Sequence, residues 1–360
     1  MEKSELKEYF IKKNDLLLKL DIQSIEIAGS ILLQKTIEIE ISEFTISVLE
    51  FFTKFNESSY KIQNNRVLFK PGPLNKTNSK VILNNDFLIP ILRVLLLIGH
   101  AFKNNLNVRI ENVITNDLES IDMYQTAFWL LFKNFNIQGY NLQIIRRAFY
   151  KNDINEVNGG IINLRIKKHS TEIESKKYES KTVLNKIRTI LVSSRLNSEF
   201  IKRMTDVVLP SMRQLSKNAK VFSQCCNKLD SGLCPGYECN VYCESREGVF
   251  YETLNYNSVK NFYKSINYTP ENIANFSFLN MMNSASKQYI FDRKLYFAYL
   301  FYMGLGSGLS TFILREIDED LNELVKVLEK SLGCKIIIKQ DRPNYKINII
   351  GIGYLNKSNI

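Results

Sequence analysis

The sequence predicts an α+β fold, in which helices pack on one face of several small sheets. Short segments alternate apolar and polar residues, which is typical of half-exposed strands, and longer segments place apolar residues three or four apart, as helices do. These segments follow one another regularly, which favours layers of helix on sheet. Hydrophobic residues make up 45% and charged residues 24% of the 360 residues, so a disordered or fibrous chain is excluded.

In the first half of the chain, periodicity predicts each element. Phe44, Val48 and Phe52 share one helical face, and Asn64 and Asn65 lie between two short strands as the residues of a hairpin turn. The expected helices cover residues 1–20, 43–55, 87–102 and 119–135, and the expected strands flank Asn64–Asn65 and cover residues 36–41, 107–113, 141–150 and 161–166.

In the second half, the polar segment 167–186 has no clear periodicity and is the expected domain boundary. We expect an insert domain of residues 183–283 within a discontinuous core domain of residues 1–182 plus 284–360. Strands are expected over 186–194, 220–226, 238–245, 335–340 and 345–353, helices over 198–216, near 257–265 and from Asp318 as N-cap to Gly333 at the C-terminal end, and a polar segment over 268–287.

The charge balance favours a polyanionic partner. Lysine and arginine number 48 against 37 aspartates and glutamates, a formal net charge of +11, which suits RNA or DNA. A general surplus of surface lysine explains the same number, and both interpretations stay open. The longest apolar run, 87–102, is too short for a membrane span, and the charged N-terminus is unlike a signal peptide, so we expect no membrane contact and an intracellular protein.

Five of the six cysteines fall in one stretch, which suggests a zinc site as one interpretation. The spacing lacks the close pairs of common zinc modules, and two of these cysteines lie four residues apart in an expected strand, about 13 Å from each other. We therefore expect free thiols, no bound metal and no cofactor, with zinc as the alternative. The five residues are Cys225, Cys226, Cys234, Cys239 and Cys243.

Familiar catalytic motifs are missing from the sequence. The glycine-rich segment 304–310 lacks the lysine of a phosphate-binding loop. Histidine occurs twice: His100 ends an apolar helix and is expected to be a capping or interior residue, and His169 is expected in solvent. Acid–base or nucleophilic chemistry based on histidine therefore has few candidates.

Six short sequence motifs occur in an order that resembles that of a known family. They are VLFKPG (67–72), NVITND (112–117), IIRRAFYKNDINEVNGG (144–160), KIRTILVSSRLNSEFIKRM (186–204), GLCPGYECNVYCES (232–245) and LYFAYLFYMGLG (295–306). Together they resemble the RNA 3′-terminal phosphate cyclase superfamily, and within it the eukaryotic nucleolar branch of cyclase-like ribosome-biogenesis proteins. The resemblance spans roughly residues 43–345, and the part before residue 43 is much shorter than the family's first strand and loop.

The resemblance implies three strand–helix–strand–helix–strand–strand units with a smaller α+β insert. In true cyclases, a histidine of the C-terminal section attacks ATP. The matching window, Tyr289–Ala298, has no histidine, and Lys294 carries a proton at neutral pH unless its pKa falls. We expect Arg293 and Lys294 to form a solvated helix start, and the protein to lack cyclase activity.

The nucleolar branch implies partners and a place in the cell. We expect a non-catalytic assembly factor of the small ribosomal subunit in the nucleus and nucleolus, bound as a monomer within a large complex. The implied partners are a large GTPase, pre-rRNA and a small nucleolar ribonucleoprotein.

Three alternatives remain at this point. A pre-rRNA endonuclease role proposed for the branch centres on a Leu-Arg-Asp-Ile-Lys text, here Leu314–Asp318, where Arg315 matches, Glu316 keeps a carboxylate and Asp318 reverses the charge of the lysine. An active cyclase is another alternative, and a basic RNA-binding protein outside the family is the third.

Two groups of basic residues are candidates for RNA or partner contact. Because neighbouring residues of a strand point to opposite faces, at most one of Arg146 and Arg147 can join a given patch. A solvated surface is the competing interpretation for each group. The first group is Arg146, Arg147 and Lys151, and the second is Arg188, Arg195, Lys202 and Arg203.

Overall fold

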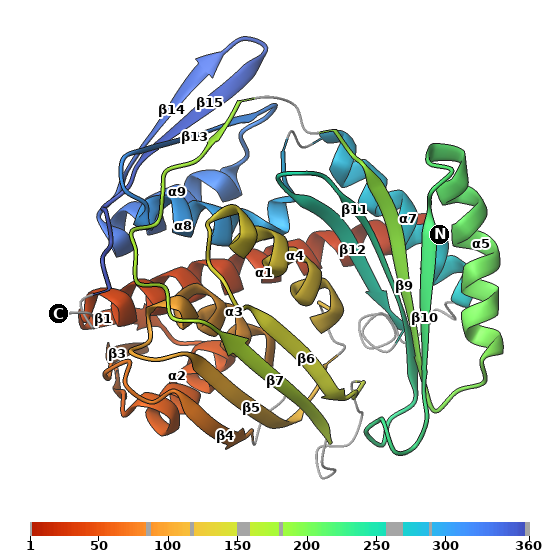
Figure 1. Ribbon diagram of the computed structural model, residues 1–360, viewed down its shortest axis with the longest axis horizontal. Helices are drawn as coiled ribbons and strands as arrows, with labels where there is room; N and C mark the ends of the chain where they lie inside the picture. Colours follow the sequence, from red (N-terminus) through yellow and green to blue (C-terminus); the bar gives the residue numbers. More distant parts are fainter. Residues whose placement is uncertain are drawn as a thin grey trace.

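The computed structural model confirms the α+β class, with four small sheets and helices packed against them (Figure 1). In the last of the three repeating units described below, a separate fourth layer is inserted between the first strand, Lys177–Tyr178, and the rest of the unit, which begins at Tyr296. The structure describes residues 2–83, 88–115, 119–149, 159–179, 183–256, 269–287 and 290–356.

One complete repeating unit lies in the first half of the chain. Its first two strands run parallel, and the last two form an antiparallel hairpin beside the second, in the order β4-β5-β7-β6. This is the strand–helix–strand–helix–strand–strand unit that the resemblance implies. Its elements are β4 (Asn78–Ile82), α3 (Leu88–Ile98), β5 (Leu106–Val113), α4 (Ile121–Asn134), β6 (Asn141–Arg146) and β7 (Gly160–Ile166).

A second sheet repeats this topology near the end of the chain. Its order is β14-β15-β13-β8, so the first two strands are again parallel and the last two again form the hairpin. Asp318 caps the second helix, as expected, and Gly333 ends it at φ 80°. The elements are β8 (Lys177–Tyr178), α8 (Tyr296–Leu305), β13 (Leu309–Leu314), α9 (Glu319–Leu332), β14 (Lys335–Asp341) and β15 (Asn344–Ile350).

The N-terminal unit is a shortened version of the same pattern. Its sheet, β1-β3-β2, has the second, fourth and third strand positions and no first strand among the described residues. Asn64 and Asn65 turn the hairpin with φ values of 47° and 61°. The elements are α1 (Glu2–Leu33), β1 (Ile37–Glu40), α2 (Glu43–Asn56), β2 (Ser59–Gln63) and β3 (Arg66–Lys70).

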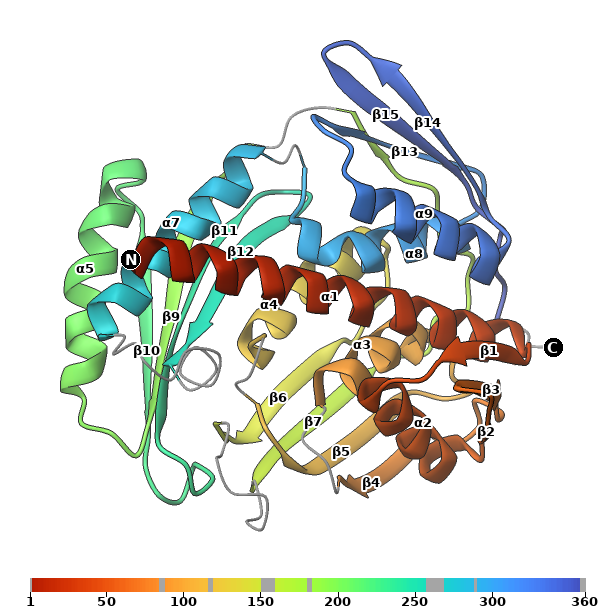
Figure 2. The same ribbon diagram turned by 180° about the vertical axis from the view of Figure 1, so that it is seen from behind.

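The first helices of the three units meet in the centre of the molecule. α1, α3 and α8 contact one another, and every residue of α3 and α8 is buried. Helix α1 extends to Leu33, well beyond the expected residues 1–20, and crosses the whole molecule (Figure 2). No helix in the described ranges is long and apolar enough to cross a membrane.

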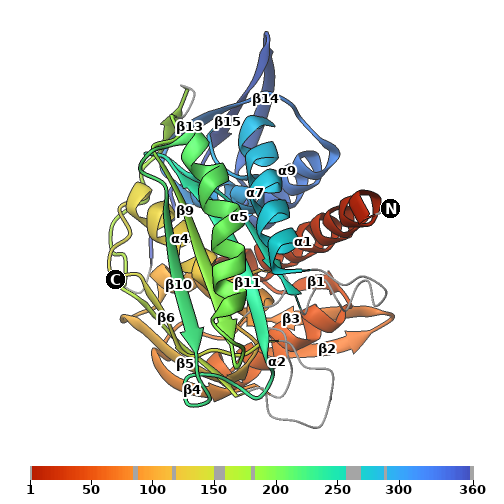
Figure 3. The same cartoon turned by 90° about the vertical axis from the view of Figure 1, so that its right-hand side faces the viewer.

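The fourth sheet, β10-β9-β11-β12, forms a separate layer whose helices α5 and α7 cover one face (Figure 3). This layer has a hydrophobic cluster of its own, which includes Leu191, Met204 and Val241 and which Tyr9 of α1 joins. The elements are β9 (Lys186–Ser194), α5 (Glu199–Leu215), β10 (Lys220–Cys226), β11 (Gly236–Glu244), β12 (Val249–Asn255) and α7 (Pro270–Lys287).

The fourth layer corrects the sequence-based expectation in one place. The segment 268–287 was expected only as a polar segment, with no helix assigned to it, yet Pro270–Lys287 forms the helix α7, with Ile273, Ser277 and Met281 buried at intervals of four. The expected helix near 257–265 lies outside the described residues. The limits 183–283 of the insert domain stay a prediction, and α7 runs past the second of them.

Candidate functional site

The two segments that the sequence singled out for chemistry lie together in the structure. Residues 293–295 form a short 3-10 helix, η2 (Arg293–Leu295), before α8, and residues 314–318 lead from β13 into α9. They share a pocket of about 180 Å³. Its lining residues are Arg293, Tyr296, Leu314, Arg315, Glu316, Asp318 and Leu321.

The charged groups of this pocket already contact other groups of the protein. Arg293 pairs with Asp318 at 3.3 Å and with Asp320. Arg315 donates to the Ser286 carbonyl at 3.1 Å, and Glu316 is exposed. The pocket thus brings Arg315 and Glu316 beside Arg293. Cleavage of a phosphodiester needs positive charge to stabilise the transition state, but Asp318 and Asp320 already neutralise the Arg293 guanidinium.

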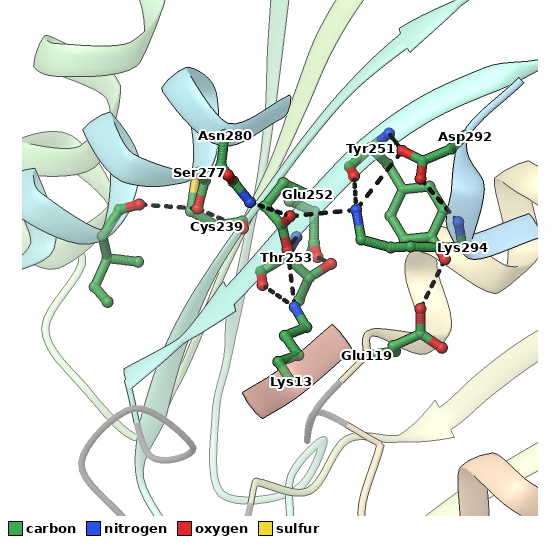
Figure 4. A network of polar contacts seen from close by, with 12 residues as sticks. Lys13, Glu119, Cys239, Tyr251, Glu252, Thr253, Ser277, Asn280, Asp292 and Lys294 are labelled. Carbon is green, nitrogen blue, oxygen red and sulfur yellow. Dashed lines mark hydrogen bonds and ion pairs between the residues drawn. The ribbon is translucent and has the colours of Figure 1, made fainter. Parts of the chain in front are cut away.

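The expectation of a solvated helix start is wrong for Lys294. Its side chain is 9% exposed, and its ammonium lies 3.2 Å from Glu252 and 3.6 Å from Asp292 (Figure 4). It also donates to the Tyr251 carbonyl at 2.8 Å. Burial alone would lower the pKa of Lys294, but the charges of Asp292 and Glu252 raise it above its usual value. Lys294 is therefore held as an ammonium, which is not a nucleophile.

Glu252 of β12 is the centre of this buried network. One carboxylate oxygen accepts from Lys13 of α1 at 2.8 Å, and the other accepts from Asn280 of α7 at 2.6 Å. Burial would raise the pKa of Glu252, yet the charges of Lys13 and Lys294 lower it to about 2. A fully ionised carboxylate thus joins three segments that are far apart in the sequence.

A second buried network lies beside the first. Arg93 of α3 is fully buried, pairs with Asp21, and donates to Glu119 at 2.8 Å. Tyr251 links the two networks, because its hydroxyl donates to Glu119 at 2.8 Å and its amide donates to Asp292 at 3.1 Å. The lone arginine in the apolar run 87–102 was the sequence signal for this network, since a buried arginine requires carboxylate partners.

Two buried carboxyl groups share the Arg93 guanidinium, and they differ in pKa. Burial raises the pKa of Asp21 to about 8 against the charge of Arg93. Burial acts on Glu119 too, but Arg93 and the hydroxyls of Tyr124 and Tyr251 keep its pKa below the usual value. Near neutral pH, Glu119 therefore carries the charge that balances Arg93.

The histidines lie away from these networks. His100 is buried against Tyr302, whose hydroxyl lies 3.3 Å from its Nδ1, and burial lowers the pKa of His100 to about 3. It is therefore a neutral interior residue, as expected. His169 is half-buried rather than fully solvated, and Thr171 contacts its ring at 3.2 Å.

Of the first basic group, Arg147 is not on the surface, which corrects its assignment as a contact residue. It is 2% exposed and binds Asp122 through both terminal nitrogens, at 2.7 and 3.0 Å. Arg146 is half-buried and donates to the Ser231 carbonyl at 3.1 Å. The Arg146 side chain, and the Arg147 backbone through Asp230 and Gly232, hold the segment after β10 against the core. Lys151 lies outside the described residues.

The second basic group is divided between two faces of the fourth sheet. Thr189 bonds to Met212 of α5, so its neighbour Arg188 points to the opposite face, toward the core units. Lys202 is exposed on α5, and Arg203 pairs with Glu271 of α7 at 2.6 Å. Arg195 is half-buried in the turn after β9. These four residues therefore do not form one patch.

All six cysteines lie in the described residues, and none of them is in a disulfide bond. Cys239 and Cys243 lie on the expected strand, β11, and burial raises the pKa of Cys243 to about 12. Within the described residues there is no group of three or more side chains that could hold a metal ion.

Comparison with known proteins identifies the family. The sequence matches the family model of RNA 3′-terminal phosphate cyclase over residues 41–338. No curated protein matches the chain. The matched range includes Glu252, Lys294 and Arg315, whereas Lys13 and Asp21 lie on α1, before it.

Proposed function

Because the chain belongs to the RNA 3′-terminal phosphate cyclase family, we propose that it is a non-catalytic member that serves as an assembly factor of the small ribosomal subunit. In this role it docks a large GTPase and pre-rRNA, together with a small nucleolar ribonucleoprotein, in the nucleolus. The ordered sequence motifs and the net charge of +11 support the role in RNA binding.

The observation that carries the non-catalytic part of the proposal is the state of Lys294. It is the amine in the window that matches the nucleophile of the cyclases, and an adenylyl transfer needs it as a free amine. Glu252 and Asp292 hold it as a buried ammonium instead. Lys13, from a helix before the matched range, occupies the other side of Glu252.

Two measurements test this proposal. Incubation with ATP labelled on its α-phosphate should leave the protein unlabelled, and RNA ending in a 3′-phosphate should remain uncyclised. If the wild type becomes labelled and the variant Lys294→Met does not, the non-catalytic proposal is wrong. Affinity purification at moderate salt should recover a large GTPase with pre-rRNA and small nucleolar RNA. Recovery of the protein without them would contradict the assembly role.

Endonuclease activity on pre-rRNA is the second candidate, because Arg315, Glu316 and Arg293 line one pocket. The double variant Arg315→Ala, Glu316→Ala tests it, with Lys326→Ala, Glu323→Ala on α9, the helix that follows this segment, as a charge-matched control. Loss of pre-rRNA cleavage in the first variant alone supports the endonuclease, and intact processing in both rejects it.

A further inference from the structure

A cleft of about 400 Å³ lies between the unit that contains α4 and β6 and the open face of the fourth sheet, away from the pocket described above. Figure 1 shows α4 beside the fourth sheet, and β12 is the strand of that sheet that contacts α4. The volume is in the range of about 300–1,000 Å³ that is common for small-molecule sites. Residues of five elements or their flanks line this cleft.

One wall of the cleft presents the single tryptophan of the chain. Trp129 of α4 is 55% exposed, although the helix buries Phe128 and Leu131 on either side. The Lys133 ammonium lies 5.3 Å from the centre of the Trp129 ring, in the geometry of a cation–π contact. An exposed indole beside a cation is the kind of platform on which nucleic-acid bases stack.

The opposite wall supplies positive charge. Lys186 and Arg188 of β9 both line the cleft, and both pair with Glu244, at 3.6 and 3.3 Å. Glu244 is the only carboxylate among the lining residues that the structure describes. Two cations thus face one anion, which leaves a net positive charge on this wall that favours a phosphate.

The lining also offers hydrogen-bonding groups suited to base edges. Gln125 and Thr126 lie one helical turn from Trp129, and Asn141 begins β6 beside them. Amide side chains both donate and accept, as do nucleobases. An aromatic platform, amides and cations therefore surround one space.

We propose that this cleft binds one nucleotide of a single-stranded RNA, with the base stacked on Trp129 and the phosphate held by Lys186 and Arg188. The choice of RNA rests on the proposed function, and the geometry of the cleft supplies the site. A duplex cannot use it, because a paired base does not expose its face.

The tryptophan itself makes the first test direct. Because Trp129 is the only tryptophan, fluorescence excited at a wavelength that the 18 tyrosines do not absorb reports on this cleft. Titration with a 12-nucleotide oligouridylate or oligoadenylate should quench the emission to saturation, and duplex RNA of the same length should not. Saturated binding, measured by anisotropy of labelled RNA, without any change in emission would overturn the proposal.

Substitutions then separate the site from the general charge of the protein. Trp129→Ala should weaken binding of labelled RNA by roughly 5- to 150-fold, the loss of one stacked base, and Trp129→Phe should restore most of the affinity. Arg188→Gln should weaken binding and reduce the slope of log affinity against log salt by about 0.7, the contribution of one phosphate contact.

The matched control is Arg109→Gln, since Arg109 of β5 is also partly exposed and also paired with a glutamate, Glu111, at 2.6 Å. Both variants lower the net charge by one, so equal losses in the two would overturn the proposal. Purification from cells distinguishes the two proposals: if Trp129→Ala still recovers pre-rRNA and binds oligonucleotides normally, the cleft proposal fails alone. If no pre-rRNA is recovered with any form although the cleft binds oligonucleotides, the assembly function fails alone.

Discussion

Replacing Lys13 by methionine tests whether the buried ion network holds the N-terminal helix to the fourth sheet. The substitution removes an ammonium that contacts the Glu252 carboxylate at 2.8 Å and the Thr253 carbonyl at 2.9 Å, in a side chain that is 1% exposed. Breaking one partner of a buried pair costs about 3–5 kcal/mol. Since Glu252 keeps Asn280 and Lys294, we expect the lower end, a loss of about 3 kcal/mol in the free energy of unfolding.

Glu252→Gln should cost more, about 5 kcal/mol, because two buried ammonium groups lose their shared carboxylate. The double variant then tests coupling. Because each single change already breaks the Lys13–Glu252 pair, the double loss should fall short of the sum by about 2 kcal/mol.

The assay is urea unfolding at pH 7, followed by far-UV circular dichroism and by Trp129 fluorescence, whose transitions must coincide if the chain unfolds in one step. Lys12→Met is the matched control: Lys12 pairs with Glu8 at 2.7 Å, but both side chains are more than half exposed, so its loss should be at most about 1 kcal/mol. A Lys13→Met loss no larger than that of the control, or strict additivity in the double variant, would refute the reasoning.

Three other predictions follow from described contacts. The charges of Lys13 and Lys294 lower the pKa of Glu252 to about 2, although burial would raise it, so ionised Glu252 stabilises the fold above about pH 4.5. Roughly 3 kcal/mol of the free energy of unfolding should therefore be lost as the pH falls toward 2. Urea midpoints measured from about pH 5 to 2.5 should show this dependence, and Glu252→Gln should flatten it. Gly72→Ala places a Cβ 1.9 Å from the Asn56 carbonyl oxygen and should lower stability by about 2–3 kcal/mol, so an unchanged melting temperature would contradict the geometry. Arg147→Gln breaks the buried pair with Asp122 and should cost about 3 kcal/mol in a urea titration, while the affinity of the folded variant for labelled RNA stays that of the wild type; a matching loss of affinity would instead place Arg147 in RNA contact.

Local sequence patterns predicted most helices and strands of this fold, because the formation of these elements depends on residues close together in the sequence. The alternating text at 36–41 contains β1, and Asp318 and Gly333 bound α9 as expected, because caps and alternation act within a few residues. β12 had no such signal: all seven residues of Val249–Asn255 are buried, so the strand shows no alternation. Helix α7 was missed because asparagine and serine interrupt its apolar stripe.

At the candidate site, contacts between residues far apart in the sequence were beyond what local patterns can predict. The resemblance drew attention to both Lys294 and Arg315, but no local pattern pairs Lys294 with Glu252 or brings Arg293 beside Arg315. Lys13 and Glu252 are 239 residues apart, and periodicity carries no information at that distance. Nothing in the charged N-terminal segment therefore marked Lys13 as an interior residue, although its side chain is 1% exposed.

The path of α1 across the molecule affects how the chain can fold while it is being made. The N-terminal half of this helix finds its partners, Glu252 and the cluster around Leu191, in segments synthesised much later. At about 5–20 residues per second, the 239 residues between Lys13 and Glu252 take roughly 12–48 s to translate. During that interval Lys13 lacks its Glu252 partner, so this part of the nascent chain is a natural segment for a chaperone to hold.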